Sequence, residues 1–151
     1  MRLWRISDYV DLSGEGGLFE PARWHLQGRK VVYLADHPAS ALIEVIAHLE
    51  VDPDDFPDSY QLSAVDMADE IAFEAVETGE LPSDWPDLLA TTQGFGDAWL
   101  TKSESALLRV PSAIVPFAWN WLLNPVHPDW SKARIAEVVR ARFDPRLFKL
   151  A

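Results

Sequence analysis

The stretch PARWHLQGRKVVYLADHPASALIEVIAHLE (residues 21–50) contains a strand, a turn and a helix around which we expect the rest of the chain to fold. The apolar run at residues 31–35 predicts a buried strand, and the Asp-His-Pro that follows predicts the start of a helix over residues 39–50. Apolar side chains recur in this helix with the spacing of one helical face: Leu42, Val45, Ile46 and Leu49. We therefore expect this face to pack against the core.

Glu44 lies on the other side of the predicted helix. Its neighbours are apolar: Ala41, Ile43 and Ala47. A helix that is apolar nearly all round is covered on both sides, and a covered carboxylate is unfavourable unless it is paired. Two interpretations follow: Glu44 is neutralised by Arg5 or Arg23 for structure alone, or it is held for chemistry.

The length of 151 residues suffices for one domain that buries about two thirds of its unfolded surface without metals or disulfides. The absence of cysteine excludes disulfides and thiolate metal sites, and it fits a reducing cytoplasm. No leader segment opens the sequence, and no apolar run approaches the roughly 20 residues that a membrane span requires. We expect one soluble, cytoplasmic domain over residues 1–151 that does not enter a membrane.

The formal net charge of −11 argues against direct binding to nucleic acid, which requires clustered lysine and arginine. Residues 31–101 contain no lysine or arginine, whereas the tail from residue 132 is rich in both. The acidic middle is either a solvated surface or a docking face for a basic partner. Because the charges are segregated, we also expect self-association or a charged partner.

The remaining elements are predicted from shorter signals. Residues 3–6 predict a first strand in which Arg5 points away from the face that carries Trp4 and Ile6. Residues 13–17 contain three glycines and form either a flexible turn or a loop whose backbone approaches a ligand. The later patterns predict a strand over 60–65, a strand or helix over 71–76, a helix over 88–102, strands over 106–110 and 112–116, a turn-rich segment over 120–129, and a helix or strand over 131–143.

The common nucleotide and metal motifs are missing. There is no glycine-rich dinucleotide motif, no P-loop and no HExxH, the four histidines lack metal-ligand spacing, and Ser112 lacks a nucleophile elbow. The guanidinium groups of Arg5 and Arg23 suit a diphosphate, and the ring of Tyr33 suits a flat heterocycle. A lone carboxylate such as Glu44 suits a glycosidic cleavage, in which positive charge develops on a sugar ring.

Simpler interpretations of the same residues stay open at this point. Tyr33 in a strand is ordinarily a core residue, and Arg23 can form a cation–π pair with Trp24. Pro111 favours a bend between the two strands predicted over 106–116. Ser112 is then either an ordinary turn residue or a hydroxyl aimed into a cleft.

Short motifs follow one another along most of the chain: WRI (4–6), SGEG (13–16), RW (23–24), VVY (31–33), ALIE (41–44), GDAWL (96–100), LRVPS (108–112), NPVHPD (124–129) and DPRL (144–147). In order and spacing these motifs resemble the RES-domain family. That family is named for its arginine, glutamate and serine, and it forms the toxin half of bacterial RES–Xre toxin–antitoxin pairs.

The resemblance implies a fold like that of ADP-ribosyltransferases of the diphtheria-toxin type, with NAD as substrate and no metal. Carried over by position, the NAD site consists of Arg5, Arg23, Tyr33, Glu44, Ser112 and Asn124. Glu44 would stabilise the ribosyl cation as nicotinamide leaves, Tyr33 would pack on the nicotinamide or ribose, and the arginines would hold the diphosphate. We expect an α+β domain with a bent mixed sheet, the helix at 39–50 against it, and the NAD cleft between residues 23–44 and the Ser112 strand.

Two departures from the family pattern bear on the reaction. Pro21 and Ala22 precede Arg23 where many members have two glycines, and His25 follows Trp24 where many have asparagine. A stiffer approach and an imidazole would alter the entry to the pocket or the choice of acceptor.

Three functions remain open. The first is a toxin that depletes NAD by hydrolysis or phosphorolysis of its nicotinamide N-glycosidic bond. In this case an Xre-like helix-turn-helix antitoxin covers the active site, the DNA contacts belong to the antitoxin, and the toxin self-associates in the complex. The second is transfer of ADP-ribose to a protein. The third is a non-catalytic module whose acidic middle binds a basic partner.

Overall fold

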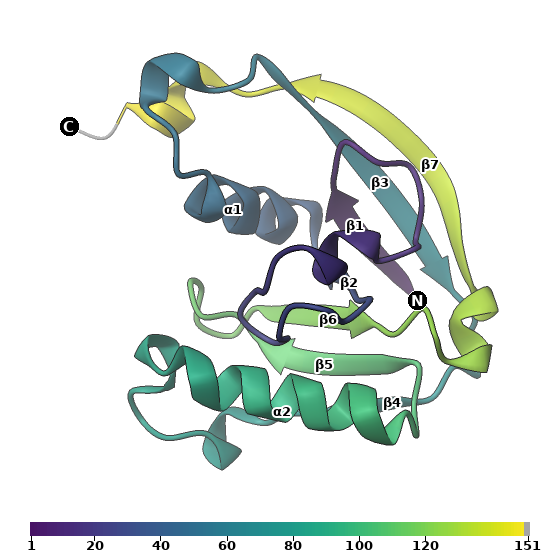
Figure 1. Ribbon diagram of the computed structural model, residues 1–151. Helices are drawn as coiled ribbons and strands as arrows, with labels where there is room; N and C mark the ends of the chain where they lie inside the picture. Colours follow the sequence, from purple (N-terminus) through teal and green to yellow (C-terminus); the bar gives the residue numbers. More distant parts are fainter. Residues whose placement is uncertain (150–151) are drawn as a thin grey trace.

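A seven-stranded mixed sheet forms the centre of the protein (Figure 1). The computed structural model describes residues 1–149, and within them the strand order is β4-β5-β6-β2-β1-β3-β7. The strands are β1 (Arg2–Ile6), β2 (Val32–Ala35), β3 (Ser59–Met67), β4 (Phe73–Ala75), β5 (Leu107–Pro111), β6 (Trp119–Leu123) and β7 (Ala133–Arg142). Neighbouring strands are antiparallel except β4 and β5, which are parallel. The α-helices are α1 (Pro38–His48) and α2 (Leu89–Lys102).

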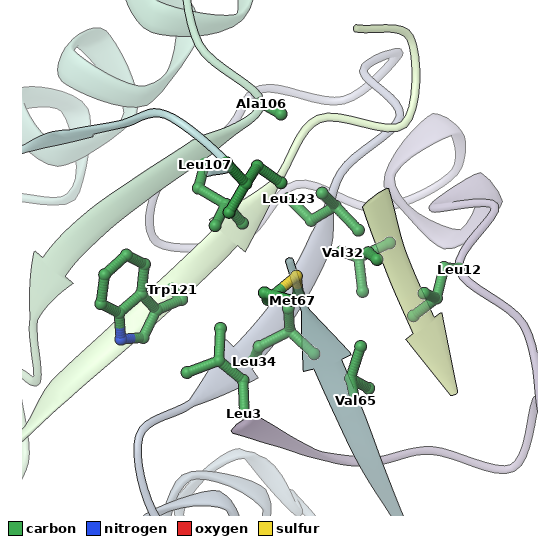
Figure 2. Close-up of a cluster of buried hydrophobic side chains, with 12 residues drawn as sticks. Leu3, Leu12, Val32, Leu34, Val65, Met67, Ala106, Leu107, Trp121 and Leu123 are labelled. Carbon is green, nitrogen blue, oxygen red and sulfur yellow. The ribbon is translucent and has the colours of Figure 1, made fainter. Parts of the chain in front are cut away.

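The sheet bends around one hydrophobic core. Leu3 of β1 and Val65 of β3 come from one half of the sheet, and Val32 of β2 and Leu107 of β5 come from the other half. All four are almost completely buried, and Figure 2 shows them gathered between the strands. The protein therefore has the α+β architecture with a bent mixed sheet that the sequence predicted.

A second core lies on the opposite face of β5 and β6, which α2 covers (Figure 1). Successive strand residues point to opposite faces, so Leu107 joins the first core and Leu108 joins the second. Trp99 and Leu100 of α2 meet Trp24 there. The segment that carries Trp24 is therefore held against α2.

Most predicted elements are confirmed, and two ambiguous segments are strands. Residues 60–65 lie within β3, the helix over 88–102 is α2, and residues 131–143 and 71–76 contain β7 and β4. Within residues 1–149, no helix combines the length and apolar character needed to cross a membrane.

The second strand of the β5–β6 hairpin was predicted wrongly. Residues 112–118 form a loop, and the returning strand is β6, within the segment that looked turn-rich. The loop turns because Ser112 Oγ accepts hydrogen bonds from the backbone N–H groups of Ile114 and Val115, both at 3.1 Å. Phe117 completes the turn with a φ of 66°. These local interactions override the strand propensity of the apolar run.

Substitutions at two glycines of α2 can test how closely this helix packs on the segment at residues 21–30. A Cβ at Gly96 would lie 1.7 Å from the carbonyl oxygen of Trp24, whereas a Cβ at Gly94 meets no atom within 4 Å. We predict that Gly96→Ala lowers the free energy of unfolding by about 3 kcal/mol or more, because the overpacked helix must move away. Gly94→Ala should raise it by about 0.5–1 kcal/mol, because alanine is the better helix former.

Urea denaturation of both variants measures these free energies. Equal effects of the two substitutions would contradict the close contact between α2 and Trp24.

Candidate active site

A cavity of about 260 Å³ lies between α1, the strands β1, β2 and β6, and the segment at residues 22–24. Strand register builds its floor, because Trp4 is paired with Ala35, and Ala35 is paired with Asn120. Alternation along β1 and β2 adds Ile6 and Tyr33 to the same face. Apolar side chains thus surround a few polar groups, an arrangement typical of small-molecule sites.

The face of α1 that meets this cavity differs from the predicted one. Its lining residues are Ala41, Glu44, Val45 and His48. These four positions also follow the i, i+3, i+4, i+7 spacing, so the nearly uniform apolar character of α1 could not identify the face. Ala41 is buried, whereas Leu42 and Ile46 of the predicted stripe are only half-buried. The helix therefore turns Glu44 towards the sheet instead of away from it.

Two neutral side chains hold the Glu44 carboxylate. Ser112 Oγ and Asn120 Nδ2 both donate to Glu44 Oε1, each at 2.7 Å. The hydroxyl of Ser112 already accepts two backbone N–H groups, so its single proton is directed to Glu44. Within residues 1–149, neither Arg5 nor Arg23 forms an ion pair with Glu44, and no hydrogen bond reaches Oε2. The structural pairing with arginine considered from the sequence is therefore wrong, and one carboxylate oxygen remains unpaired at the cavity.

Asn120 was not predicted as a site residue. The sequence signal that could have found it is an amide inside the otherwise apolar strand Trp119–Leu123. Because the surrounding segment looked turn-rich, this polar residue was assigned to a turn.

Arg23 lies at the edge of the cavity and is held by groups near α2. Its Nη1 donates to the carbonyl oxygen of Pro86 at 3.0 Å, and its guanidinium carbon lies 5.9 Å from the centroid of the Trp85 ring. The aromatic partner is therefore Trp85, not the neighbouring Trp24. Thr92 Oγ1 donates to the Arg23 carbonyl oxygen at 2.6 Å, so α2 also fixes the backbone of this arginine.

Arg5 points away from Trp4 and Ile6, as the strand alternation predicted: it is paired with Ser63, whereas Trp4 is paired with Ala64. Its guanidinium donates to the carbonyl oxygens of Tyr9 and Asp11 and so holds the loop that follows β1. Burial lowers the pKa of Arg5. Arg5 is also among the residues that line the cavity.

Tyr33 lines the cavity, and its hydroxyl belongs to a hydrogen-bond chain behind it. The backbone N–H of Trp24 donates to Tyr33 Oη at 3.2 Å, and His25 Nδ1 lies 2.8 Å from the same oxygen. His25 Nε2 lies 2.9 Å from the carbonyl oxygen of Glu20. His25 is almost completely buried, and this burial lowers its pKa.

Asn124, which the resemblance placed in the site, is not among the residues that line the cavity. Asn124 Nδ2 donates to Ser103 Oγ at 3.2 Å, and its Oδ1 accepts from the backbone N–H of Val126 at 3.0 Å. The buried amide thus fixes the turn after β6.

The glycine-rich loop at residues 13–17 packs closely against the backbone of Arg29 and Val31. Gly14 has a φ of 67°, and a Cβ at Gly17 would lie 2.1 Å from the carbonyl oxygen of Arg29. Gly17 is therefore required for close backbone packing against the segment that carries His25. Within residues 1–149, no cluster of acidic, histidine or cysteine side chains has an arrangement that could hold a metal ion.

The depressed pKa of His25 has a testable consequence for stability. In the unfolded chain His25 takes up a proton near pH 6.5, but in the folded protein it does so only at lower pH. Its contribution to the free energy of unfolding is therefore present above pH 6.5 and is lost as the pH falls. We predict that the free energy of unfolding, measured by urea denaturation, falls less between pH 7.5 and pH 5.5 for His25→Asn than for wild type. An equal fall in both proteins would contradict a buried neutral imidazole.

The chain is thus an α+β domain in which a bent sheet carries a cavity that combines a fixed carboxylate with arginine and tyrosine. The sequence model of the family described as the RES domain matches residues 2–144. The chain belongs to this RES domain family.

Two relatives span nearly the whole chain. Toxin Res of Pseudomonas putida strain KT2440 is 43% identical over 148 residues, which cover 98% of this chain and 100% of the relative. Prs ADP-ribosylating toxin of Sphingobium sp. strain YBL2 is 34% identical over 158 residues, which cover 98% and 97%, respectively.

A solved structure has a similar fold. A chain in the crystal structure of the M. tuberculosis MbcT–MbcA toxin–antitoxin complex matches with a TM-score of 0.74 at 20% sequence identity. The match covers 98% of this chain and 86% of that chain. The match shows that this chain shares the fold of that chain.

Proposed function

We propose that this protein is the toxin of a toxin–antitoxin system and that it depletes NAD by cleaving the bond between nicotinamide and ribose. One observation carries the proposal. The Glu44 carboxylate is fixed through Oε1 by Ser112 and Asn120, while no hydrogen bond within residues 1–149 reaches Oε2 at the cavity. A fixed carboxylate beside a sugar is the group that stabilises an oxocarbenium-like transition state.

The reaction balances without a metal or a redox partner. The C–N bond breaks heterolytically, its electron pair leaves with the nicotinamide nitrogen, and the pyridinium becomes neutral nicotinamide. The ribosyl carbon becomes positively charged, and Glu44 stabilises this charge. Attack by water gives ADP-ribose and releases a proton, whereas attack by phosphate gives the corresponding ribosyl phosphate.

The arginines and Tyr33 supply binding in this proposal. Arg23 lines the cavity and uses Nη1 for the Pro86 carbonyl, so its other N–H groups remain to donate to a diphosphate. Arg5 would add a second cation from β1. The ring of Tyr33 would pack on the nicotinamide or its ribose.

A second candidate function is transfer of ADP-ribose to a protein. The relative named Prs ADP-ribosylating toxin favours it, because the two sequences align over nearly their whole lengths. The bond that breaks is the same, and a nucleophilic group of the target protein replaces water. A non-catalytic module is the remaining alternative, and it requires no NAD turnover.

We further propose that an Xre-like helix-turn-helix antitoxin covers the cavity and that the toxin self-associates within a cytoplasmic complex. The likeness to a chain of a toxin–antitoxin complex supports a protein partner. Tyr9 and Val10 on the loop held by Arg5, and Phe117 on the loop held by Ser112, are exposed apolar side chains that such a partner would cover.

The test is loss of NAD with release of nicotinamide, measured on purified protein with and without phosphate and cell extract. We predict that Glu44→Gln lowers kcat by about 100-fold or more, because the fixed negative charge is lost. Glu50→Gln makes the same chemical change at an exposed position outside the cavity and should leave the activity intact. Arg23→Ala should raise KM for NAD through loss of a diphosphate contact.

The outcomes separate the three functions. Nicotinamide release that requires phosphate indicates phosphorolysis, and release without any additive indicates hydrolysis. Labelled protein bands in extract support transfer to a protein. No turnover by antitoxin-free wild type under any condition contradicts both enzymatic functions and favours the non-catalytic module.

A further inference from the structure

The hydrogen-bond chain behind Tyr33 has a definite direction. A backbone carbonyl only accepts, so His25 Nε2, which lies 2.9 Å from the Glu20 carbonyl oxygen, carries a proton. A backbone N–H only donates, so Tyr33 Oη accepts from Trp24. In a neutral imidazole the other nitrogen is an acceptor, and His25 Nδ1 therefore receives the Tyr33 hydroxyl proton over 2.8 Å. Burial lowers the pKa of His25 and raises that of Tyr33, which favours this arrangement.

In this hydrogen-bond chain the proton of the Tyr33 hydroxyl is donated to another residue of the protein. A tyrosine hydroxyl has one proton, and here that proton is directed to His25, away from any ligand. The hydroxyl also accepts from Trp24, so both its donor and one acceptor position are occupied. Tyr33 therefore has no proton left to donate to a ligand, and it lines the cavity with its ring.

His25 is itself held in place. Its Nε2 contacts the Glu20 carbonyl oxygen, and the ring packs closely on Gly17, where an added Cβ would lie only 3.0 Å from Nε2. The backbone around it is also tied, since Ala22 and His25 form an isolated β-bridge and Ala22 lines the cavity. An imidazole held in this way can act as a rigid support for the wall of the site.

We propose that His25 is a positioning residue that accepts the hydroxyl proton of Tyr33 through Nδ1 and so makes Tyr33 present its ring, not a hydrogen-bond donor, to NAD. This inference rests on the proposed function, because it assigns a role in NAD binding. It assigns the contact of Tyr33 with NAD to the ring and not to the hydroxyl proton.

Two substitutions of His25 each keep one of its two hydrogen bonds and remove the other. In His25→Asn the side-chain oxygen stands where Nδ1 was, so the acceptor for Tyr33 is kept and the contact with Glu20 is lost. In His25→Gln the amide reaches the position of Nε2, so the contact with Glu20 can be kept and the acceptor for Tyr33 is lost. We expect kcat/KM for NAD cleavage to be at least tenfold higher in His25→Asn than in His25→Gln, mainly through KM. Similar losses in both variants would overturn the proposal, because they would indicate a structural role alone.

The Tyr33→Phe background provides the second test. If His25 acts through the Tyr33 hydroxyl, adding His25→Gln to Tyr33→Phe causes no further loss of kcat/KM. A further loss as large as that in the wild-type background would overturn the proposal, because His25 would then act by another route. Urea denaturation of each variant confirms that the compared proteins are folded.

A spectroscopic measurement keeps this inference distinct from the proposed function. Long-range proton–nitrogen NMR spectra identify the tautomer of His25 in the wild-type protein without substrate. We expect a protonated Nε2 and an unprotonated Nδ1, and a protonated Nδ1 at neutral pH would overturn the proposal. If the expected tautomer is found but NAD is not turned over, the proposed function is refuted, and with it the role of His25 in NAD binding. The hydrogen bond from the Tyr33 hydroxyl to His25 Nδ1 would still stand.

Discussion

The contact between Glu44 and the β5–β6 hairpin is the interaction on which the site depends. A carboxylate beside apolar side chains is unfavourable unless it accepts hydrogen bonds. Ser112 and Asn120 each donate one hydrogen bond to the same oxygen of Glu44. This contact joins α1 to a hairpin about 70 residues further along the chain, since Ser112 is 68 residues from Glu44. The cavity lies between these two elements, so the interaction that holds the carboxylate also links two walls of the site.

Several polar groups around the cavity are already hydrogen-bonded to other parts of the protein. Arg5 holds the loop after β1, Arg23 contacts Pro86, and the Tyr33 hydroxyl lies in a chain with Trp24 and His25. Prior hydrogen bonding of this kind fixes side chains before a ligand arrives, which lowers the entropic cost of binding. It also limits the atoms offered to the ligand to a carboxylate oxygen, the remaining guanidinium N–H groups and an aromatic ring. In the function that we propose, this set would contact the positively charged nicotinamide ribose and the diphosphate of NAD.

The sequence predicted the elements whose patterns are local, and it missed those that depend on contacts distant in the chain. The strand at β2 and the helix α1 follow from an apolar run, a capping His37 and Pro38. The direction of Glu44 could not be derived in this way, because every face of α1 is largely apolar and the donors come from β5 and β6. Asn120 was missed because Ser112 turns the chain early and shifts the returning strand to Trp119–Leu123. Family resemblance placed Arg23, Tyr33, Glu44 and Ser112 in the proposed site, but it also added Asn124, whose amide is used in a turn.

Cleavage at Glu44 is tested most directly by a crystal structure of Glu44→Gln with NAD bound, since this variant should bind the dinucleotide but cleave it far more slowly than wild type. We expect the nicotinamide ribose in the cavity beside residue 44, with the nicotinamide or its ribose against the Tyr33 ring and the diphosphate near Arg23. NAD bound elsewhere on the protein, with this cavity empty, would contradict cleavage at Glu44.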